Sequence, residues 1–208
     1  KYQMPPLFHD MTDVFASRQI RYLATLGGNL GSASPIGDTW PVLIALNAGV
    51  KLVSTTGERT LPVADFITGY HKTALQKDEL IASIIIPVPS QDSIFRFQKI
   101  SKRKQTDIST LNLAIGLRIN EHGLVKNPVI VFGGMAAVPV RLTPAEAILD
   151  SEVLNKERIE EACHTAMEGF QPVSDARASA EGRLLLAENA MRKALLSILS
   201  TNLKYETD

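Results

Sequence analysis

Small and hydroxyl-bearing residues gather near the N-terminus in one stretch, Thr25-Leu-Gly-Gly-Asn-Leu-Gly-Ser-Ala-Ser34. Glycines let a backbone approach a ligand closely and expose successive amide N–H groups. Thr25, Ser32 and Ser34 add hydroxyl groups, and Asn29 adds a side-chain amide. Together with the start of a following helix, these groups could bind a diphosphate without any lysine.

The same stretch departs from the known nucleotide motifs. It lacks the Lys-Ser/Thr pair of a P-loop, and it lacks the third glycine and the strand-turn-helix frame of the dinucleotide fingerprint. On composition alone, a glycine-serine stretch is more often a plain connector. The residues therefore leave two interpretations open, a connector and an anion-binding loop.

The flanking sequence predicts the elements that would position this loop. Asp38 stands where a helix N-cap belongs, ahead of the apolar residues 42–48, and Gly49 is a stop signal. Residues 7–16 have their apolar side chains near helical spacing, which predicts a short helix. We therefore expect a loop, too poor in side chains to build a core, that leads directly into a helix.

Strands are predicted further along the chain. Residues 50–54 and 60–63 flank Thr56-Gly57, which indicates a hairpin, and residues 80–86 indicate a buried strand. Residues 111–119 alternate strictly between large apolar residues and Asn112, Ala114, Gly116 and Arg118, which predicts a half-buried strand. Three helical segments follow, at 144–149, 156–170 and 178–203.

This pattern predicts an α+β fold with two lobes, each an antiparallel sheet with helices packed against it. The breakers within residues 88–93 place the boundary, which gives domains at 1–90 and 91–208.

The bulk composition excludes some function classes. Lys plus Arg equals Asp plus Glu at 22 each, so no global charge favours nucleic acid or an anionic membrane. No apolar run reaches the roughly 20 residues that span a bilayer. Cys163 is the single cysteine, which excludes an intrachain disulfide, indicates a reducing cytoplasm and suggests a buried apolar role. The four histidines are scattered, so we expect no metal site.

A wider string carries a resemblance. Residues 25–38, followed by Pro41 and residues 43–46, closely resemble the second FAD-binding segment of the xanthine dehydrogenase and CO dehydrogenase flavoproteins. With Asn29 and Ser34-Pro-Ile-Gly-Asp38, the string is most similar to the C-terminal part of the bacterial xanthine dehydrogenase small subunit. The resemblance continues through 69–73, 78–81, 99–103 with 107–108, 132–136 and 174–179.

The resemblance implies a fold. Residues 1–90 are expected to form the second subdomain of a PCMH-type FAD-binding domain, an antiparallel sheet with helices. Residues 91–208 are expected to form an α+β domain like the C-terminal domain of CO dehydrogenase flavoprotein. A first FAD-binding subdomain, and a cysteine-rich region with two 2Fe-2S clusters, are expected to lie outside this sequence.

It also implies site residues. Those expected along the FAD pyrophosphate and ribose are Thr25, Leu26, Gly27, Gly28, Asn29 and Ser32. Asp38 is expected to accept a hydrogen bond from the cofactor, with a helix N-cap as the alternative. Phe15 is expected to pack beside the adenine, with a core position as the alternative.

Further residues are expected nearer the flavin ring. Ile81 would touch the flavin, and it would be a core strand residue in either case. Lys99 would approach the ring, whereas charge pattern alone favours a solvated loop for residues 99–104. Tyr70 would lie at the entrance on the nicotinamide side.

The implied activity is that of a molybdenum hydroxylase that oxidises hypoxanthine and xanthine. Xanthine would be hydroxylated at a molybdenum cofactor in a large partner subunit, and electrons would cross the iron–sulfur clusters to FAD and then NAD. The chain would be part of a hetero-oligomer, with no nucleic-acid partner. The alternatives are a CO, aldehyde or nicotine dehydrogenase flavoprotein, or a cofactor-free assembly module.

Overall fold

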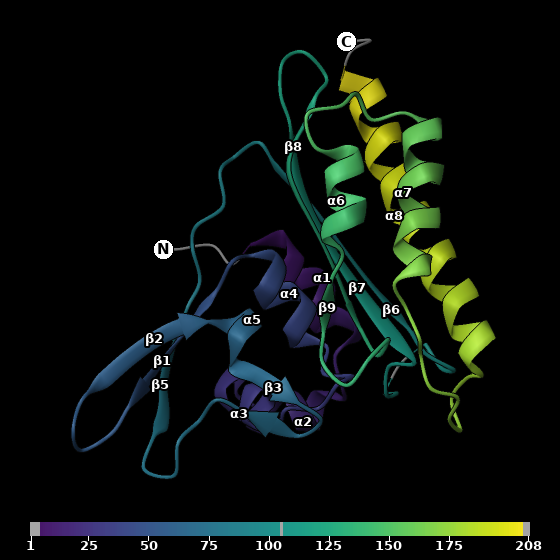
Figure 1. Ribbon diagram of the computed structural model, residues 1–208. Helices are drawn as coiled ribbons and strands as arrows, with labels where there is room; N and C mark the ends of the chain where they lie inside the picture. Colours follow the sequence, from purple (N-terminus) through teal and green to yellow (C-terminus); the bar gives the residue numbers. More distant parts are fainter. Residues whose placement is uncertain (1–4, 105, 206–208) are drawn as a thin grey trace.

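A computed structural model describes residues 5–104 and 106–205 of the chain (Figure 1). Its helices are α1 (Pro6–Val14), α2 (Arg18–Leu23), α3 (Leu26–Gly31), α4 (Thr39–Ala45), α5 (Val63–Phe66), α6 (Thr143–Leu149), α7 (Lys156–Glu168) and α8 (Ala180–Tyr205). Its strands are β1 (Gly49–Val53), β2 (Glu58–Pro62), β3 (Ile67–Gly69), β4 (Lys72–Thr73), β5 (Leu80–Ile85), β6 (Ser93–Ile100), β7 (Leu111–Ile119), β8 (Val125–Gly133) and β9 (Val140–Arg141).

The strands form antiparallel sheets, as predicted. Strands β2-β1-β5 make a three-stranded sheet, β3 and β4 pair as a small hairpin, and β6-β7-β8-β9 make a four-stranded sheet. The hairpin predicted around Thr56-Gly57 is confirmed, because Val53 pairs with Glu58 across it.

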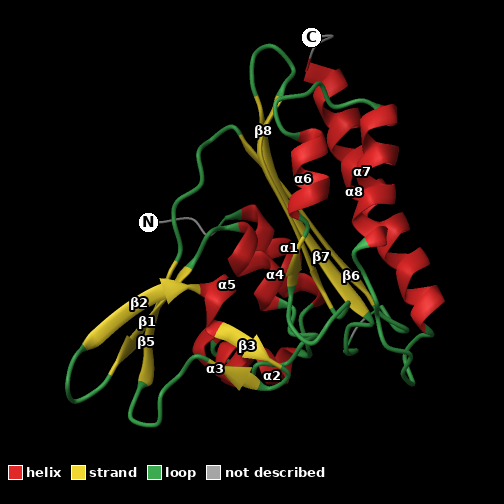
Figure 2. Ribbon diagram, in the orientation of Figure 1, coloured by secondary structure: helices red, strands yellow, loops and turns green. Residues whose placement is uncertain are grey.

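Helices cover both faces of the four-stranded sheet (Figure 2). Leu113 and Ile115 of β7 belong to the apolar cluster under α6, α7 and α8, while Ala114 belongs to the cluster with α1 and α4. The prediction of a half-buried β7 was therefore wrong. Strict alternation shows that the two faces differ, but it does not show that either face is open to water.

The small residues on β7 allow α4 to approach the sheet. A β-carbon at Gly116 would lie 2.8 Å from the ring of Phe95 and 3.5 Å from the backbone oxygen of Ala45 at the end of α4. Close packing leaves little room for such an atom. The small residues that alternate with large apolar ones along β7 therefore form the surface against which α4 packs.

Strand β5 is not buried, which contradicts the prediction. Leu80 is 71% exposed and Ile85 is 48% exposed. The strand lies at the edge of the three-stranded sheet, where it pairs with β1. An apolar run does not distinguish a central strand from an edge strand.

The glycine-rich stretch forms the short helix α3, where a loop was predicted. Thr25 is its N-cap, and the Thr25 hydroxyl oxygen accepts a hydrogen bond from the Gly28 amide at 2.9 Å. Leu30 is fully buried, so the stretch also contributes to the core. A good cap offsets part of the entropy that glycine costs a helix.

The two predicted lobes share one of the two apolar clusters of the described residues. Trp40 and Leu43 of α4 lie in the same buried cluster as Ala114 and Val131 of the four-stranded sheet. The division at residues 90 and 91 stays a prediction.

Two smaller features complete the fold. Cys163 is fully buried, as expected, and burial raises the pKa of its thiol to about 12. Among the described helices, none is both long enough and apolar enough to cross a bilayer.

Candidate cofactor cleft

A cavity of about 460 Å³ opens between the first helices and strand β6. It brings together four of the predicted site residues from four places in the sequence: Phe15, Asn29, Asp38 and Lys99. We call this cavity the cleft. Its other lining residues are Ala16, Ser17, Ile20, Ser34, Ile36, Gly37, Arg103, Thr106, Asp107, Ile108 and Ser109.

Asp38 and Lys99 form a buried ion pair at the base of the cleft. The Lys99 Nζ atom lies 2.7 Å from Asp38 Oδ2, and the two side chains are 5% and 6% exposed respectively. Ser109 Oγ and Asn112 Nδ2 both donate to Asp38 Oδ1, the latter at 2.9 Å. The carboxylate thus has three side-chain donors, which offset the cost of its burial.

These contacts decide between the alternative interpretations of Asp38 and of Lys99. Asp38 occupies the N-cap position of α4, but its side chain accepts no capping hydrogen bond, so the N-cap interpretation of the carboxylate was wrong. The solvated-loop interpretation was wrong for Lys99, which belongs to β6. Lys102, Arg103 and Lys104 are exposed, and Arg103 also lines the cleft.

Strand register explains why Lys99 and Asn112 meet at Asp38. The two residues are cross-strand partners on β6 and β7, so their side chains share a face. Gly133 is the partner of Asn112 on β8, and a β-carbon there would collide with Asn112 Oδ1. The glycine at position 133 therefore makes room for the amide that holds Asp38.

Helix α3 presents one residue, Asn29, to the cleft, and neighbouring hydroxyl groups bind that residue. The Thr39 hydroxyl donates to Asn29 Oδ1, which fixes the Asn29 side chain. Ser32 Oγ donates to the Asn29 carbonyl at 2.7 Å. With only six residues, α3 carries a small dipole, so its N–H groups rather than a macrodipole would attract an anion.

The remaining predicted residues lie outside the lining of the cleft. They are Thr25, Leu26, Gly27, Gly28, Ser32 and Ile81. Ile81 packs against α3, since a β-carbon at Gly27 would lie 3.6 Å from Ile81 Cγ2.

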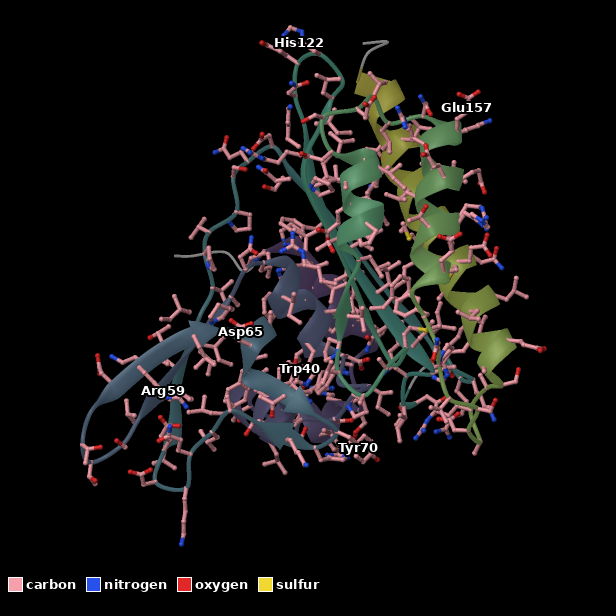
Figure 3. The ribbon with its side chains drawn as sticks, in the orientation of Figure 1. Trp40, Arg59, Asp65, Tyr70, His122 and Glu157 are labelled. Carbon is pink, nitrogen blue, oxygen red and sulfur yellow. The ribbon has the colours of Figure 1, made fainter. Side chains whose placement is uncertain are left out.

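Tyr70 lies elsewhere. It is 64% exposed beside the β3–β4 hairpin (Figure 3) and lines a second cavity of about 810 Å³. Ser34 and Ile36 line both cavities, so residues 34–37 form the wall between them.

Sequence reasoning missed the groups that hold the ion pair. Ser109, Asn112 and Thr39 are buried polar residues that bind predicted site residues. Asn112 carried a signal, because a polar amide within a strongly apolar strand needs a partner if both faces are covered. The partner itself is distant in sequence and leaves no local pattern.

Comparison with known proteins identifies the class. Two family models match the chain: the FAD binding domain in molybdopterin dehydrogenase over residues 2–89, and the CO dehydrogenase flavoprotein C-terminal domain over residues 96–198. The chain therefore belongs to the family of flavoproteins built from these two domains. The expected α+β fold, an FAD-binding domain followed by a flavoprotein C-terminal domain, is confirmed.

Individual relatives agree with this assignment. The chain is 41% identical to the xanthine dehydrogenase of Emericella nidulans over 136 residues, 65% of this chain and 10% of that protein. It is 30% identical to the carbon monoxide dehydrogenase medium chain of Afipia carboxidovorans over 190 residues, 91% of this chain and 65% of the relative. The chain thus spans about a tenth of the xanthine dehydrogenase and about two thirds of the medium chain.

Solved structures show the same fold. The cyanide-inactivated Cu,Mo-CO dehydrogenase superposes with a TM-score of 0.85 at 29% identity, over 91% of this chain and 66% of that one. Quinoline 2-oxidoreductase from Pseudomonas putida 86 superposes with a TM-score of 0.85 at 26% identity, over 92% and 66% of the two chains.

FAD is the cofactor of this family, and the cleft has groups that suit part of it. Phe15 offers an aromatic face, Lys99 and Ser109 offer polar groups, and Ile36 and Ile108 offer apolar walls. The cavity volume falls within the range of roughly 300–1,000 Å³ that is typical of small-molecule sites. The residues present therefore fit a portion of the cofactor.

Proposed function

We propose that this chain forms one wall of the FAD site of a molybdenum-containing xanthine dehydrogenase. In that enzyme, electrons from hypoxanthine or xanthine would pass through 2Fe-2S clusters and FAD to NAD. The single observation that carries the proposal is the convergence of Phe15, Asn29, Asp38 and Lys99 on one cleft. The identity with the xanthine dehydrogenase of Emericella nidulans supports the choice of substrate.

Each residue of the cleft has a distinct role in the proposal. FAD, when bound, would supply the electron-accepting chemistry. Phe15 would pack beside the adenine, and Asn29, with the α3 backbone, would bind the pyrophosphate side. Asp38 would orient Lys99, whose ammonium group would face the flavin ring and raise its potential.

The proposed partners follow from the same reasoning. NAD would be the acceptor, an iron–sulfur domain would deliver electrons, and a molybdenum-cofactor subunit would hold the substrate, so the enzyme would be a hetero-oligomer. The single cysteine supports a reducing cytoplasm as its location.

The cofactor proposal is tested by removing the aromatic face. Phe15→Ala in the assembled enzyme should weaken FAD binding by about 1–3 kcal/mol, the range for stacking of a base on an aromatic side chain. Tyr70→Ala is the matched control, because Tyr70 is an aromatic residue that lines the other cavity. Titration of the flavin-depleted enzyme with FAD measures both. Equal affinity in the two variants would contradict the proposal.

A second substrate class has comparable support. The chain is also 41% identical, over 130 residues, to the nicotinate hydroxylase hnxS of Emericella nidulans. Steady-state rates of the assembled enzyme with xanthine, nicotinate, an aldehyde and CO would decide between them. We expect xanthine to be oxidised fastest with NAD as acceptor. A flavin-free purified enzyme would instead support an assembly module.

A further inference from the structure

The proposed function gives no role to the motif Ser174-Asp-Ala-Arg-Ala-Ser179 and the arginine that follows it. The structure shows that residues 174–183 form a capped entry to α8. Ser174 Oγ accepts a hydrogen bond from the Ala180 amide at 2.8 Å, and Ser179 Oγ accepts one from the Gly182 amide at 3.0 Å. These caps fix the first turn of α8 and so fix the position of Arg183.

Arg183 joins its own motif to two distant segments. Its side chain is 4% exposed, and its Nη2 atom lies 2.8 Å from Asp175 Oδ1. Its Nη1 atom donates to the carbonyl oxygen of Thr110, and to that of Gly134 at 3.1 Å. The guanidinium therefore binds the start of β7 and the end of β8 at the same time.

Both carbonyl groups belong to segments that hold Asp38. Thr110 lies between Ser109 and the strand that carries Asn112, and these two side chains donate to the Asp38 carboxylate. The Gly134 amide donates to the carbonyl of Pro35 at 2.9 Å, in the wall of the cleft. Displacement of Arg183 would therefore loosen the supports of Asp38 without touching the cleft itself.

A second contact links the same motif to the loop after Lys99. Lys102 Nζ donates to the Ala176 carbonyl at 2.7 Å. Figure 1 shows the first turns of α8 near the ends of β6 and β7 that face this loop. The motif thus contacts the polypeptide on both sides of the ion pair between Asp38 and Lys99.

Packing of α8 against the sheet does not by itself explain an arginine at position 183. Its neighbours on the buried side of α8, Ala187 and Met191, belong to the apolar cluster under α6, α7 and α8. A buried guanidinium is costly, and Arg183 Nε has no hydrogen-bond partner among the described residues. An arginine in this place is explained by its planar fork, which binds two carbonyl groups and a carboxylate together.

We propose that Arg183, anchored by Asp175, is a positioning residue for the FAD cleft that acts through Ser109, Asn112 and Asp38. This inference rests on the proposed function. Because Arg183 lies outside the lining of the cleft, it sets the geometry of the Asp38–Lys99 pair rather than contacting the cofactor.

The experiment compares Arg183→Lys with Arg192→Gln in the assembled enzyme. Arg192 is the matched control, since it lies on the same helix and pairs with Glu160 and Glu188, away from the cleft. Arg183→Lys keeps the charge but cannot reproduce the fork, so the FAD Kd should rise about tenfold, equivalent to one charge-assisted hydrogen bond. Arg192→Gln should lower the thermal midpoint and leave the FAD Kd unchanged.

Hydrogen exchange supplies a readout that does not depend on FAD. In Arg183→Lys, amides within residues 35–38 and 109–112 should exchange faster, whereas in Arg192→Gln they should match the parent. If Arg183→Lys does not fold, Asp175→Asn replaces it, because Asp175 is 40% exposed and the substitution removes the charge that anchors the Arg183 guanidinium. An unchanged FAD Kd and unchanged exchange in a folded variant would overturn the inference. A parent enzyme that binds no FAD would instead overturn the proposed function. The exchange result would still test whether Arg183 positions the segments around Asp38.

Discussion

The two faces of the four-stranded sheet are built from the same strands but hold different side chains. The face under α7 and α8 carries Leu111, Leu113 and Ile115, and it forms an apolar core. The face under α1 and α4 carries aromatic and small residues, and it ends in Lys99 and Asn112. The first face stabilises the fold, whereas the second also builds a buried polar site. The difference shows that a site can be placed at the end of a core face without opening the sheet to water.

The largest expected effect follows from breaking the buried ion pair. Lys99→Met leaves the Asp38 carboxylate buried without its counter-ion, so the free energy of unfolding should fall by about 3–5 kcal/mol. Adding Asp38→Asn should recover much of this loss, because the uncompensated charge is then gone. Denaturant unfolding of the parent, Lys99→Met and the double variant measures these changes in the free energy of unfolding. Equal stability of the two variants would show that the pair is not coupled.

An intermediate effect is expected for the amide that supports the pair. Asn112→Leu removes one of three side-chain donors to Asp38, which should cost about 1.5–3 kcal/mol of stability. The same variant should also weaken FAD binding in the assembled enzyme, since Asp38 is proposed to orient Lys99. Retention of full FAD affinity by a folded Asn112→Leu would separate the polar cluster from the cofactor.

A smaller effect is expected on the opposite face. Ile115→Val removes one methyl group from a fully buried residue, which should cost about 0.5–1.5 kcal/mol. Because Ile115 faces α7 and α8, the FAD Kd should not change. A shift in the FAD Kd would contradict the division of roles between the two faces.

The smallest effect concerns the three-stranded sheet, where Arg59 (Figure 3) pairs with Glu79 at 2.6 Å. Hydrogen bonds from the Arg59 guanidinium and the Gln76 amide hold the pKa of Glu79 at about 2, below the 4.5 of a free glutamate. A lowered carboxyl pKa adds stability above pH 4.5 that is lost as the pH falls toward 2. The difference in the free energy of unfolding between the parent and Glu79→Gln should therefore become smaller as the pH falls through this window. Denaturant unfolding at several pH values measures this difference, and Glu121→Gln, at an exposed glutamate, is the control. A difference between parent and Glu79→Gln that stays constant with pH would contradict the lowered pKa of Glu79.

The sequence predicted the positions of helices and strands better than it predicted their burial. Breakers and caps located α4, the β1–β2 hairpin and the strands of the larger sheet, because these signals are local. Burial was predicted less well, since the alternation along β7 contains no information about which helices cover each face. The exposed Leu80 shows the same failure at a sheet edge.

For the site, too, some residues could be predicted from the sequence and others could not. The resemblance selected Phe15, Asn29, Asp38 and Lys99, which the fold places on one cleft. It did not find Asn112 or Arg183, because their roles depend on contacts with residues more than 70 positions away. Long-range polar contacts of this kind require the strand register, which a single sequence does not specify.

The central claim, that the cleft beside Asp38 and Lys99 binds FAD, is tested most directly by hydrogen exchange of the assembled enzyme with and without FAD. The account predicts that FAD protects amides in three segments that line the cleft, residues 15–17, 36–38 and 106–109. It also predicts no change in residues 60–65, which line a separate cavity of about 530 Å³. Protection of residues 60–65, with unchanged exchange around Asp38, would contradict it.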